Sequence, residues 1–308
     1  MPHSNITWSP EKDIKSLKGK SILITGGSNG LGRQSALDLA RHQPTEIWLA
    51  ARSASRAEAV IDEIKRLDPS VSVKFLPLDL NSFSSIREAA RIFLASATRL
   101  DILLLNAGVM NVPLGSVTEE GYEMHFGTNH VGHALLVKLL ASLLRQTAQS
   151  SEVRVVLVSS VAHKFGPSGG LQFDSFKPKT GNSGLSPNAL YGQSKLANLL
   201  FAREMARRCP EWTTVSIHPG TVKTDLQGSE SGPFLIKAFQ AIVVPLIGVS
   251  VEEGAKNQLW AATADGVLNG EYYVPIGIPG KGSALSKDEV LARKLWDWTE
   301  AELRGIEP

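Results

Sequence analysis

The sequence is poor in cysteine, in aromatic residues and in net charge. Its 308 residues include one cysteine, Cys209, which excludes an internal disulfide and favours a reducing compartment. The 32 basic and 30 acidic side chains nearly balance and form no basic stripe, so we expect a small-molecule partner and no nucleic acid. The first residues, MPHSNITWSPEKDIKSLKGK, lack the apolar run of a secretory signal, so we expect a cytoplasmic protein.

Long hydrophobic runs are also missing. The most apolar stretch, residues 234–249, is interrupted by Lys237, Gln240 and Pro245 and is shorter than the roughly 20 residues of a membrane span. We therefore expect no transmembrane span, and interpret the stretch as a buried helix or a pocket lid. Contact with a membrane surface stays open as the alternative.

Metal-binding motifs are absent as well. His125, His130 and His133 lie close together around "TNHVGH", but no cysteine or carboxylate completes a ligand set and H-E-x-x-H does not occur. We predict no metal and interpret these histidines as packing residues.

Short apolar segments alternate with helical patterns along the chain. The predicted strands are Ser21–Thr25, Glu46–Ala51, Val71–Leu76, Asp101–Leu105, Val153–Val158 and Thr213–His218. Helix-like segments such as Arg56–Leu67 and Phe83–Ala97 are long enough for right-handed crossovers. Runs such as "VVLVSS" are typical of parallel strands covered on both faces. The sequence predicts an α/β fold: a single Rossmann-type domain over residues 18–308, with a doubly wound parallel sheet and helices on both faces, after a polar N-terminal segment 1–17.

Two long connections interrupt this alternation. Residues 161–189 follow the fifth predicted strand and residues 220–251 follow the sixth. Both leave the carboxyl ends of strands, where open α/β sheets bind their ligands. We expect these segments to form the walls of a substrate pocket.

The glycine-rich octet TGGSNGLG, residues 25–32, stands between the first strand and a helix. Glycines there permit positive φ and close approach of a phosphate, and the helix offers unpaired N–H groups. The sequence predicts an anion-binding turn, although the spacing differs from G-x-G-x-x-G and a plain tight turn stays possible. The candidate binding residues are Gly26, Asn29, Gly30, Leu31 and Gly32.

A series of motifs in fixed order accompanies this turn. They are Asp79-Leu80, Asn106-Ala107-Gly108, Asn129, Ser159-Ser160, Tyr191-x3-Lys195 and Pro219-Gly220. With the T-G-x3-G-x-G turn they make the sequence resemble the short-chain dehydrogenase/reductase (SDR) family, over roughly residues 18–275. The pieces "TNHVGHALL" and "SSVAH" resemble its retinol-dehydrogenase-like branch and fungal short-chain reductases of that branch.

The end of the second strand indicates which dinucleotide binds. The strand ends in Ala51-Arg52-Ser53 without the acid that would hold a ribose 2'-hydroxyl. Arg52, with Arg56, is placed to bind a 2'-phosphate, so we predict NADP(H). The alternative is that Arg52 is a solvated loop cation.

The resemblance implies further cofactor contacts. It places Asp79 and Leu80 beside the adenine and Asn106, Ala107 and Gly108 beside the adenosine ribose. It also places a stretch after the sixth strand, Pro219, Gly220, Thr221, Val222 and Thr224, near the nicotinamide and pyrophosphate. For Asp79 a cap of the following helix, before Ser82, is an equal alternative.

Tyr191 and Lys195 are the centre of the predicted chemistry. Four residues apart on a helix, they share a face, and an ammonium group beside a phenol lowers its pKa. Tyr191 is therefore the candidate proton donor or acceptor, and Ser160 the hydrogen-bond donor to the reacting oxygen. Ser159 competes with Ser160, and the resemblance favours the second serine. It also implies that Lys195 binds the nicotinamide ribose and that Asn129 holds a relay water.

These residues together predict a function. We expect an NADP(H)-dependent oxidoreductase that interconverts a ketone or aldehyde and an alcohol on an apolar small molecule. Reduction of an activated carbon–carbon double bond, or a non-catalytic dinucleotide-binding regulator, are the alternatives. The resemblance also implies a possible homodimer.

Overall fold

The computed structural model describes residues 7–179, 183–222 and 248–308. The strands are β1 (Ser21–Thr25), β2 (Glu46–Ala51), β3 (Ser72–Pro77), β4 (Ile102–Leu105), β5 (Arg154–Val158), β6 (Thr213–Ile217) and β7 (Tyr272–Tyr273). The α-helices are α1 (Pro10–Asp13), α2 (Gly30–Ala40), α3 (Ala54–Leu67), α4 (Phe83–Ser96), α5 (Met124–Phe126), α6 (Gly132–Ala148), α7 (Pro187–Arg208), α9 (Val251–Thr263) and α10 (Glu289–Glu302). Shorter turns are the π-helical η1 (Gly127–Val131) and the 3₁₀ turns η2 (Val161–Phe165), η3 (Phe173–Ser175) and η5 (Leu285–Lys287).

The strands form one parallel sheet in the order β3-β2-β1-β4-β5-β6-β7. The predicted doubly wound Rossmann-type sheet is thereby confirmed, and the chain reverses its winding direction between β1 and β4. All the predicted strands form, with ends shifted by no more than a residue, as in β4, which begins at Ile102 instead of Asp101. The prediction omits β7, whose two residues pair with Ser216 and Ile217 of β6.

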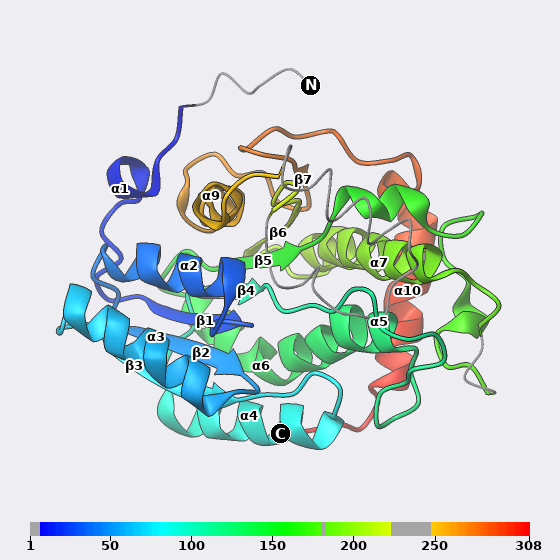
Figure 1. Cartoon of the computed structure of the whole chain (residues 1–308), viewed down its shortest axis with the longest axis horizontal. Coiled ribbons are helices and arrows are strands. Elements are labelled where there is room, and N and C mark those ends of the chain that lie inside the picture. Colours follow the sequence, from blue (N-terminus) through cyan, green and yellow to red (C-terminus); the bar gives the residue numbers. More distant parts are fainter. Residues whose placement is uncertain (1–6, 180–182, 223–247) are drawn as a thin grey trace.

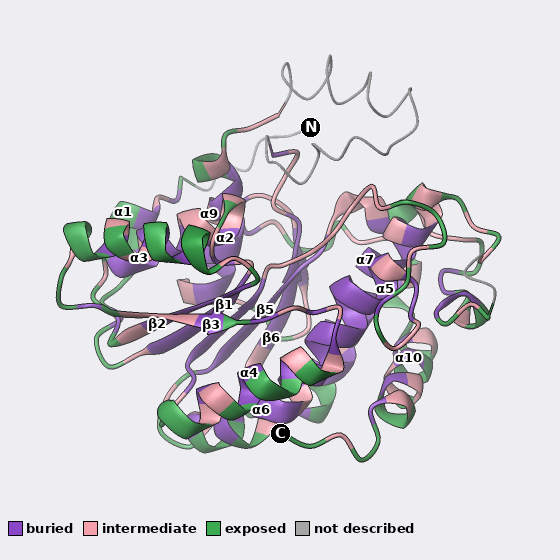
Figure 2. Cartoon of the chain, turned by 60° about the horizontal axis from the view of Figure 1, so that its bottom comes forward, coloured by how far each residue is buried: buried purple, intermediate pink, exposed green. Residues whose placement is uncertain are grey.

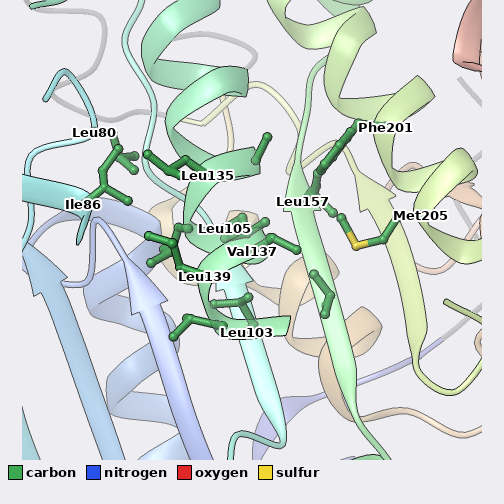
Figure 3. Packing of buried hydrophobic residues seen from close by; sticks show 14 of the residues in the cluster. Leu80, Ile86, Leu103, Leu105, Leu135, Val137, Leu139, Leu157, Phe201 and Met205 are labelled. Atoms are coloured by element: carbon green, nitrogen blue, oxygen red, sulfur yellow. The ribbon is translucent and has the colours of Figure 1, made fainter. Parts of the chain in front are cut away.

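Each face of the sheet carries its own apolar core, because alternate residues of a strand point to opposite faces. Leu103 and Leu105 of β4 belong to one cluster, whereas Ile102 and Leu104 belong to the other. Helices α4, α6 and α7 cover the first face, and α2, α3 and α9 cover the second, so the strands lie buried between two helical layers (Figures 1 and 2). Figure 3 shows the first cluster, with side chains of β4 and β5 facing Leu135, Leu139, Phe201 and Met205.

The N-terminal segment packs onto the domain. Trp8, Ile14 and Leu17 are buried among the side chains of the second cluster, and α1 contacts α2 and α9. Residues 8–17 of the predicted polar N-terminal segment 1–17 therefore extend the second core cluster. Three apolar side chains among polar neighbours suffice to attach the segment.

The C-terminal segment forms helix α10, which packs along α7 (Figure 1). Trp296 stacks on Phe201 of α7 with ring centroids 5.0 Å apart. Within residues 7–179, 183–222 and 248–308, no helix is both long enough and apolar enough to cross a membrane. Residues 234–247 of the apolar stretch lie outside the described residues.

Candidate active site

A cavity of about 520 Å³ opens at the carboxyl ends of the strands, where the winding direction of the sheet reverses. Its walls bring together nearly all of the predicted site residues. Those that line it are Gly26, Asn29, Gly30, Leu31, Arg52, Asp79, Leu80, Asn106, Ala107, Gly108, Ser160, Tyr191, Lys195, Pro219, Gly220, Thr221 and Val222. Gly32 and Asn129 are buried behind the wall, and Thr224 lies outside the described residues.

The glycine turn has the geometry that its sequence predicts. Gly26 and Gly30 have φ of 68° and 50°, a region that favours glycine, and Asn29 caps α2 by accepting from the Gly30 N–H at 2.8 Å. A Cβ on Gly32 would overlap the Gly26 carbonyl and lie 2.6 Å from the Asn106 amide nitrogen. The turn therefore brings α2 against the strand ends and leaves its N-terminus facing the cavity, which fits a dinucleotide pyrophosphate.

Thr25 joins this turn to the next strand. Its hydroxyl accepts from the main-chain N–H groups of Asn106 and Ala107 at 2.9 and 3.0 Å. It also lies 2.9 Å from Nε2 of buried His133, whose Nδ1 is 3.1 Å from the Asn129 carbonyl. Because a carbonyl only accepts, His133 is protonated at Nδ1 and accepts from Thr25. This network fixes the wall on which the resemblance places the adenosine ribose.

The end of the cavity beside β2 carries the two cations that are predicted to bind a 2'-phosphate. Arg52 and Arg56 are exposed and both line the cavity near the Ala51 end of β2. Asp79 also lines it and accepts from the Asn81 N–H at 3.0 Å. The cap of α4 is Ser82, which accepts from the Ser85 N–H, so Asp79 is not the helix cap.

Ser160 and Tyr191 lie together at the other end of the cavity, away from Arg52. The Ser160 hydroxyl lies close enough to the Tyr191 phenol to favour its ionised form, and both residues line the cavity. Ser159 is buried and donates its hydroxyl proton to the Lys195 carbonyl at 2.7 Å. The structure thus distinguishes the two serines by their hydroxyl groups. Both residues line the cavity, but the Ser159 hydroxyl holds α7 to the end of β5, whereas the Ser160 hydroxyl acts on Tyr191.

Lys195 lies beneath Tyr191. Its ammonium group donates to the Val158 carbonyl at 3.1 Å and lies 5.7 Å from the centroid of the tyrosine ring. Burial lowers the pKa of Lys195 to about 8, so the charged form still prevails at neutral pH.

The pKa of Tyr191 corrects a prediction. The sequence predicts that Lys195 lowers this pKa, but burial raises the pKa of Tyr191 to about 12, and the hydrogen bond to Ser160 opposes that rise only in part. Burial disfavours the phenolate and is the largest influence on this pKa. Tyr191 is therefore a neutral phenol at physiological pH, the form that donates a proton.

Asn129 lies at the centre of η1 and is fully buried. Its side chain accepts from the Val109 N–H at 2.8 Å and donates to the Val109 carbonyl and the Ser194 hydroxyl. A Cβ on Gly108 would lie 3.1 Å from Asn129 Oδ1 and 3.4 Å from Lys195 Nζ, so the three residues are neighbours. Asn129 thus joins the exit of β4 to α7, beside Lys195.

Sequence reasoning missed other residues at the site. Val161, Ala162 and Asn188 line the cavity, and the sequence predicted them only as members of the pocket-wall connection 161–189. Met110 also lines the cavity, and no sequence signal indicated it. Gly192, next to Tyr191, lies against η2: a Cβ there would come within 2.8 Å of the Ala162 carbonyl oxygen and 2.7 Å of the Gly166 nitrogen. A glycine inside a helix gives no hint of such a contact.

The histidines near the site are engaged in packing. His130 lies 3.0 Å from the Thr299 hydroxyl, and the His125 Nδ1 lies 2.7 Å from a Glu123 carboxylate oxygen. Across the described parts of the chain, no three His, Cys, Asp or Glu side chains gather as a metal site requires.

Comparison with known proteins places this architecture in a family. Residues 20–175 match the short chain dehydrogenase family. A short-chain dehydrogenase/reductase of Armillaria gallica is 37% identical over 302 residues, which is 96% of this chain and 94% of that protein. Human retinol dehydrogenase 11 is 36% identical over 295 residues, 94% of this chain and 87% of that protein.

Solved structures show the same fold. The RhlG/NADP active-site complex of Pseudomonas aeruginosa matches with a TM-score of 0.65 at 23% identity, over 85% of this chain and 96% of that chain. The sequence relatives, the matched family and the site geometry agree. This chain belongs to the short-chain dehydrogenase/reductase family, in its retinol-dehydrogenase-like part, a family of oxidoreductases that bind a nicotinamide dinucleotide.

Proposed function

We propose that this protein is an NADP(H)-dependent oxidoreductase that reduces a ketone or aldehyde of an apolar small molecule to an alcohol. The observation that carries the proposal is the placement of Ser160, Tyr191 and Lys195 together at the wall of one cavity, with the Lys195 ammonium nitrogen 5.7 Å from the centroid of the Tyr191 ring. Reduction of a carbonyl needs a proton donor at the oxygen, and a phenol with a pKa of about 12 is protonated at working pH.

The cofactor would occupy the larger part of the cavity. The glycine turn would hold its pyrophosphate, Asp79 and Leu80 its adenine, and Arg52 and Arg56 a 2'-phosphate. When bound, the nicotinamide supplies the hydride that reduces the carbonyl carbon.

The protein's own groups act on the carbonyl oxygen. Ser160 and Tyr191 both donate hydrogen bonds to it, and Tyr191 then releases its proton as negative charge develops. Lys195 lies near enough to stabilise the tyrosinate that remains, because its ammonium group is charged at neutral pH. The apolar walls at this end, Val161, Ala162 and Met110, exclude water and favour an apolar substrate. Human retinol dehydrogenase 11, 36% identical, is named for an alcohol of that kind.

The proposal is tested by following NADPH oxidation over a panel of apolar aldehydes, ketones and enones. Consumption with carbonyls supports it. If purified protein binds NADPH and consumes it only with enones, double-bond reduction replaces the proposal. If no compound is reduced, either a narrow substrate outside the panel or a non-catalytic binding role replaces it.

Arg52 is expected to determine the preference for the phosphorylated dinucleotide. Changing Arg52→Ala removes one of the two cations near the Ala51 end of β2, so NADPH should bind about 10-fold more weakly, with little change for NADH. Dissociation constants from nucleotide fluorescence would show this. Lys65→Ala, an exposed cation of α3 outside the cavity, is the matched control, and equal weakening for both nucleotides in Arg52→Ala would contradict the assignment.

Gly192→Ala is expected to lower kcat by about 10²-fold, because a shift of one ångström in a catalytic group has effects of that size. The added Cβ would meet main-chain atoms of η2, which cannot rotate away, and would displace the turn that follows Ser160. Carbonyl turnover and the NADPH dissociation constant should be measured together. The affinity should stay near wild type, since the glycine turn is remote from η2, and unchanged kcat would refute the expectation.

A further inference from the structure

His163 is a buried imidazole directly behind Ser160. It lies in η2 and is 2% exposed. Its Nδ1 is 2.7 Å from the Ser160 carbonyl oxygen, and its Nε2 is 3.1 Å from the main-chain nitrogen of Ser283. The His163 ring thus links two segments that lie 120 residues apart in the sequence.

These two partners determine the tautomer of the ring. The Ser160 carbonyl only accepts, so Nδ1 carries the proton, and the Ser283 N–H only donates, so Nε2 carries none. A neutral imidazole satisfies both partners, and an imidazolium would place an N–H against the N–H of Ser283. Burial, the largest influence, holds the pKa of His163 below its usual value, which agrees with the neutral form.

The carbonyl of Ser160 belongs to the turn that orients its hydroxyl. Ser160 caps η2: its Oγ accepts from the Ala162 N–H at 3.1 Å, and its carbonyl accepts from the main-chain N–H of His163, also at 3.1 Å. The ring of His163 adds the shorter of the two bonds to that carbonyl. Rotation of the Ser160 peptide would therefore break the ring's bond and move the hydroxyl relative to Tyr191.

The other side of the ring is anchored firmly. Ser283 accepts from the Ser286 hydroxyl through its carbonyl at 2.7 Å, in the turn that leads to η5 and α10. The Tyr272 ring of β7 packs edge-on against His163, with centroids 5.3 Å apart. The imidazole cannot shift without disturbing β7 or the Ser283 turn.

We propose that His163 is a positioning residue for Ser160: its Nδ1–H holds the Ser160 carbonyl, and its Nε2 ties this turn to the C-terminal segment at Ser283. The inference rests on the proposed function, because it needs Ser160 at the reacting oxygen. It assigns a task to a histidine that makes no contact with the reacting atoms.

Two substitutions each remove one of the two hydrogen bonds of the His163 ring and keep the other. In His163→Asn the amide nitrogen takes the place of Nδ1 and retains the bond to Ser160, while the bond to Ser283 is lost. In His163→Gln the amide oxygen takes the place of Nε2 and retains the bond to Ser283, while the bond to Ser160 is lost. Each variant loses one buried hydrogen bond, so the melting temperatures should fall by similar amounts.

Turnover should distinguish the variants although their stability does not. With the best carbonyl substrate of the panel, we expect kcat of His163→Gln to fall about 10- to 100-fold, and kcat of His163→Asn to stay within about threefold of wild type. The NADPH dissociation constant should be unchanged in both. Equal kcat values in the two variants, at any level, would overturn the proposal.

Two further measurements complete the test. Nitrogen NMR of the histidine rings should show His163 protonated at Nδ1 and not at Nε2 at neutral pH, and the opposite tautomer would overturn the proposal without any assay of activity. Tyr191→Phe is measured in parallel. If Tyr191→Phe loses activity and His163→Gln does not, this inference fails alone, whereas wild-type turnover by Tyr191→Phe removes the proposed function and the inference with it.

Discussion

Replacing Tyr191 by phenylalanine should lower kcat by about 10²–10⁴-fold, the usual contribution of a positioned general acid. The phenol lies in the cavity wall with Ser160, and its pKa of about 12 keeps the proton available at neutral pH. Phenylalanine fills the same space without the hydroxyl. The binding of NADPH should remain within a few-fold of wild type, because the turn and the cations near Arg52 are untouched.

The measurement is NADPH consumption under single-turnover conditions, which excludes product release from the observed rate. Tyr273→Phe is the matched control. It removes the hydroxyl of another tyrosine, which lies in β7 and accepts from the Leu268 N–H, away from the cavity. That variant should lose some stability and keep its kcat. Similar losses in the two variants would mean that the Tyr191 hydroxyl has a structural role only.

Most of the sheet could be predicted from the sequence because its strands are covered on both faces. Runs such as Ile102–Leu105 are apolar at every position, and such runs stand out from the helical patterns beside them. Strand β7 could not be predicted in this way. Two tyrosines are too few to show a periodicity, and their pairing with β6 depends on α9 and the rest of the chain between β6 and β7. The packing of Trp8 against the second cluster could not be predicted either, because isolated apolar residues in a polar stretch do not indicate which residues they pack against.

The site residues show the same difference between what sequence patterns reveal and what depends on the folded chain. Residues whose type is required by chemistry or by backbone geometry, such as Gly26, Tyr191 and Lys195, could be named from motifs. The direction of the pKa shift of Tyr191 could not, because sequence spacing shows a neighbouring charge but not the burial that outweighs it. Gly192 contacts the distant segment from Ala162 to Gly166, and His163 contacts the distant Ser283. Such contacts exist only in the folded chain.

The buried histidines predict a second large effect, a loss of stability in mild acid. Burial lowers the pKa of His130 to about 3, and those of His133 and His218 to about 4, from a usual value of 6.5. Between these values the unfolded chain binds protons that the folded chain does not. The free energy of unfolding therefore falls as the pH drops below 6.5, and the loss is complete only below the lowered pKa values.

The size of this effect is large relative to the stability of a domain. One pKa unit corresponds to about 1.4 kcal/mol, so His133 alone contributes a loss of about 3 kcal/mol between pH 6.5 and pH 4. Domains are stable by only about 5–15 kcal/mol, so three such residues should remove a large part of the free energy of unfolding in this window. Asp101 acts at lower pH: although burial opposes it, hydrogen bonds from Arg99 and Ser151 lower the pKa of Asp101, so its contribution is lost below pH 3.8.

Urea unfolding at several pH values between 4 and 6.5 would measure this slope. His130→Gln should retain a hydrogen bond to Thr299 and remove one of the titrating rings, so its stability should depend on pH less steeply than that of wild type. At neutral pH the variant loses packing against Phe126 and Phe201 and should be less stable than wild type. The two stability curves should therefore converge as the pH falls, because the variant does not carry the cost of protonating that ring. Parallel curves would show that residue 130 does not titrate on unfolding and that the acid sensitivity has another origin.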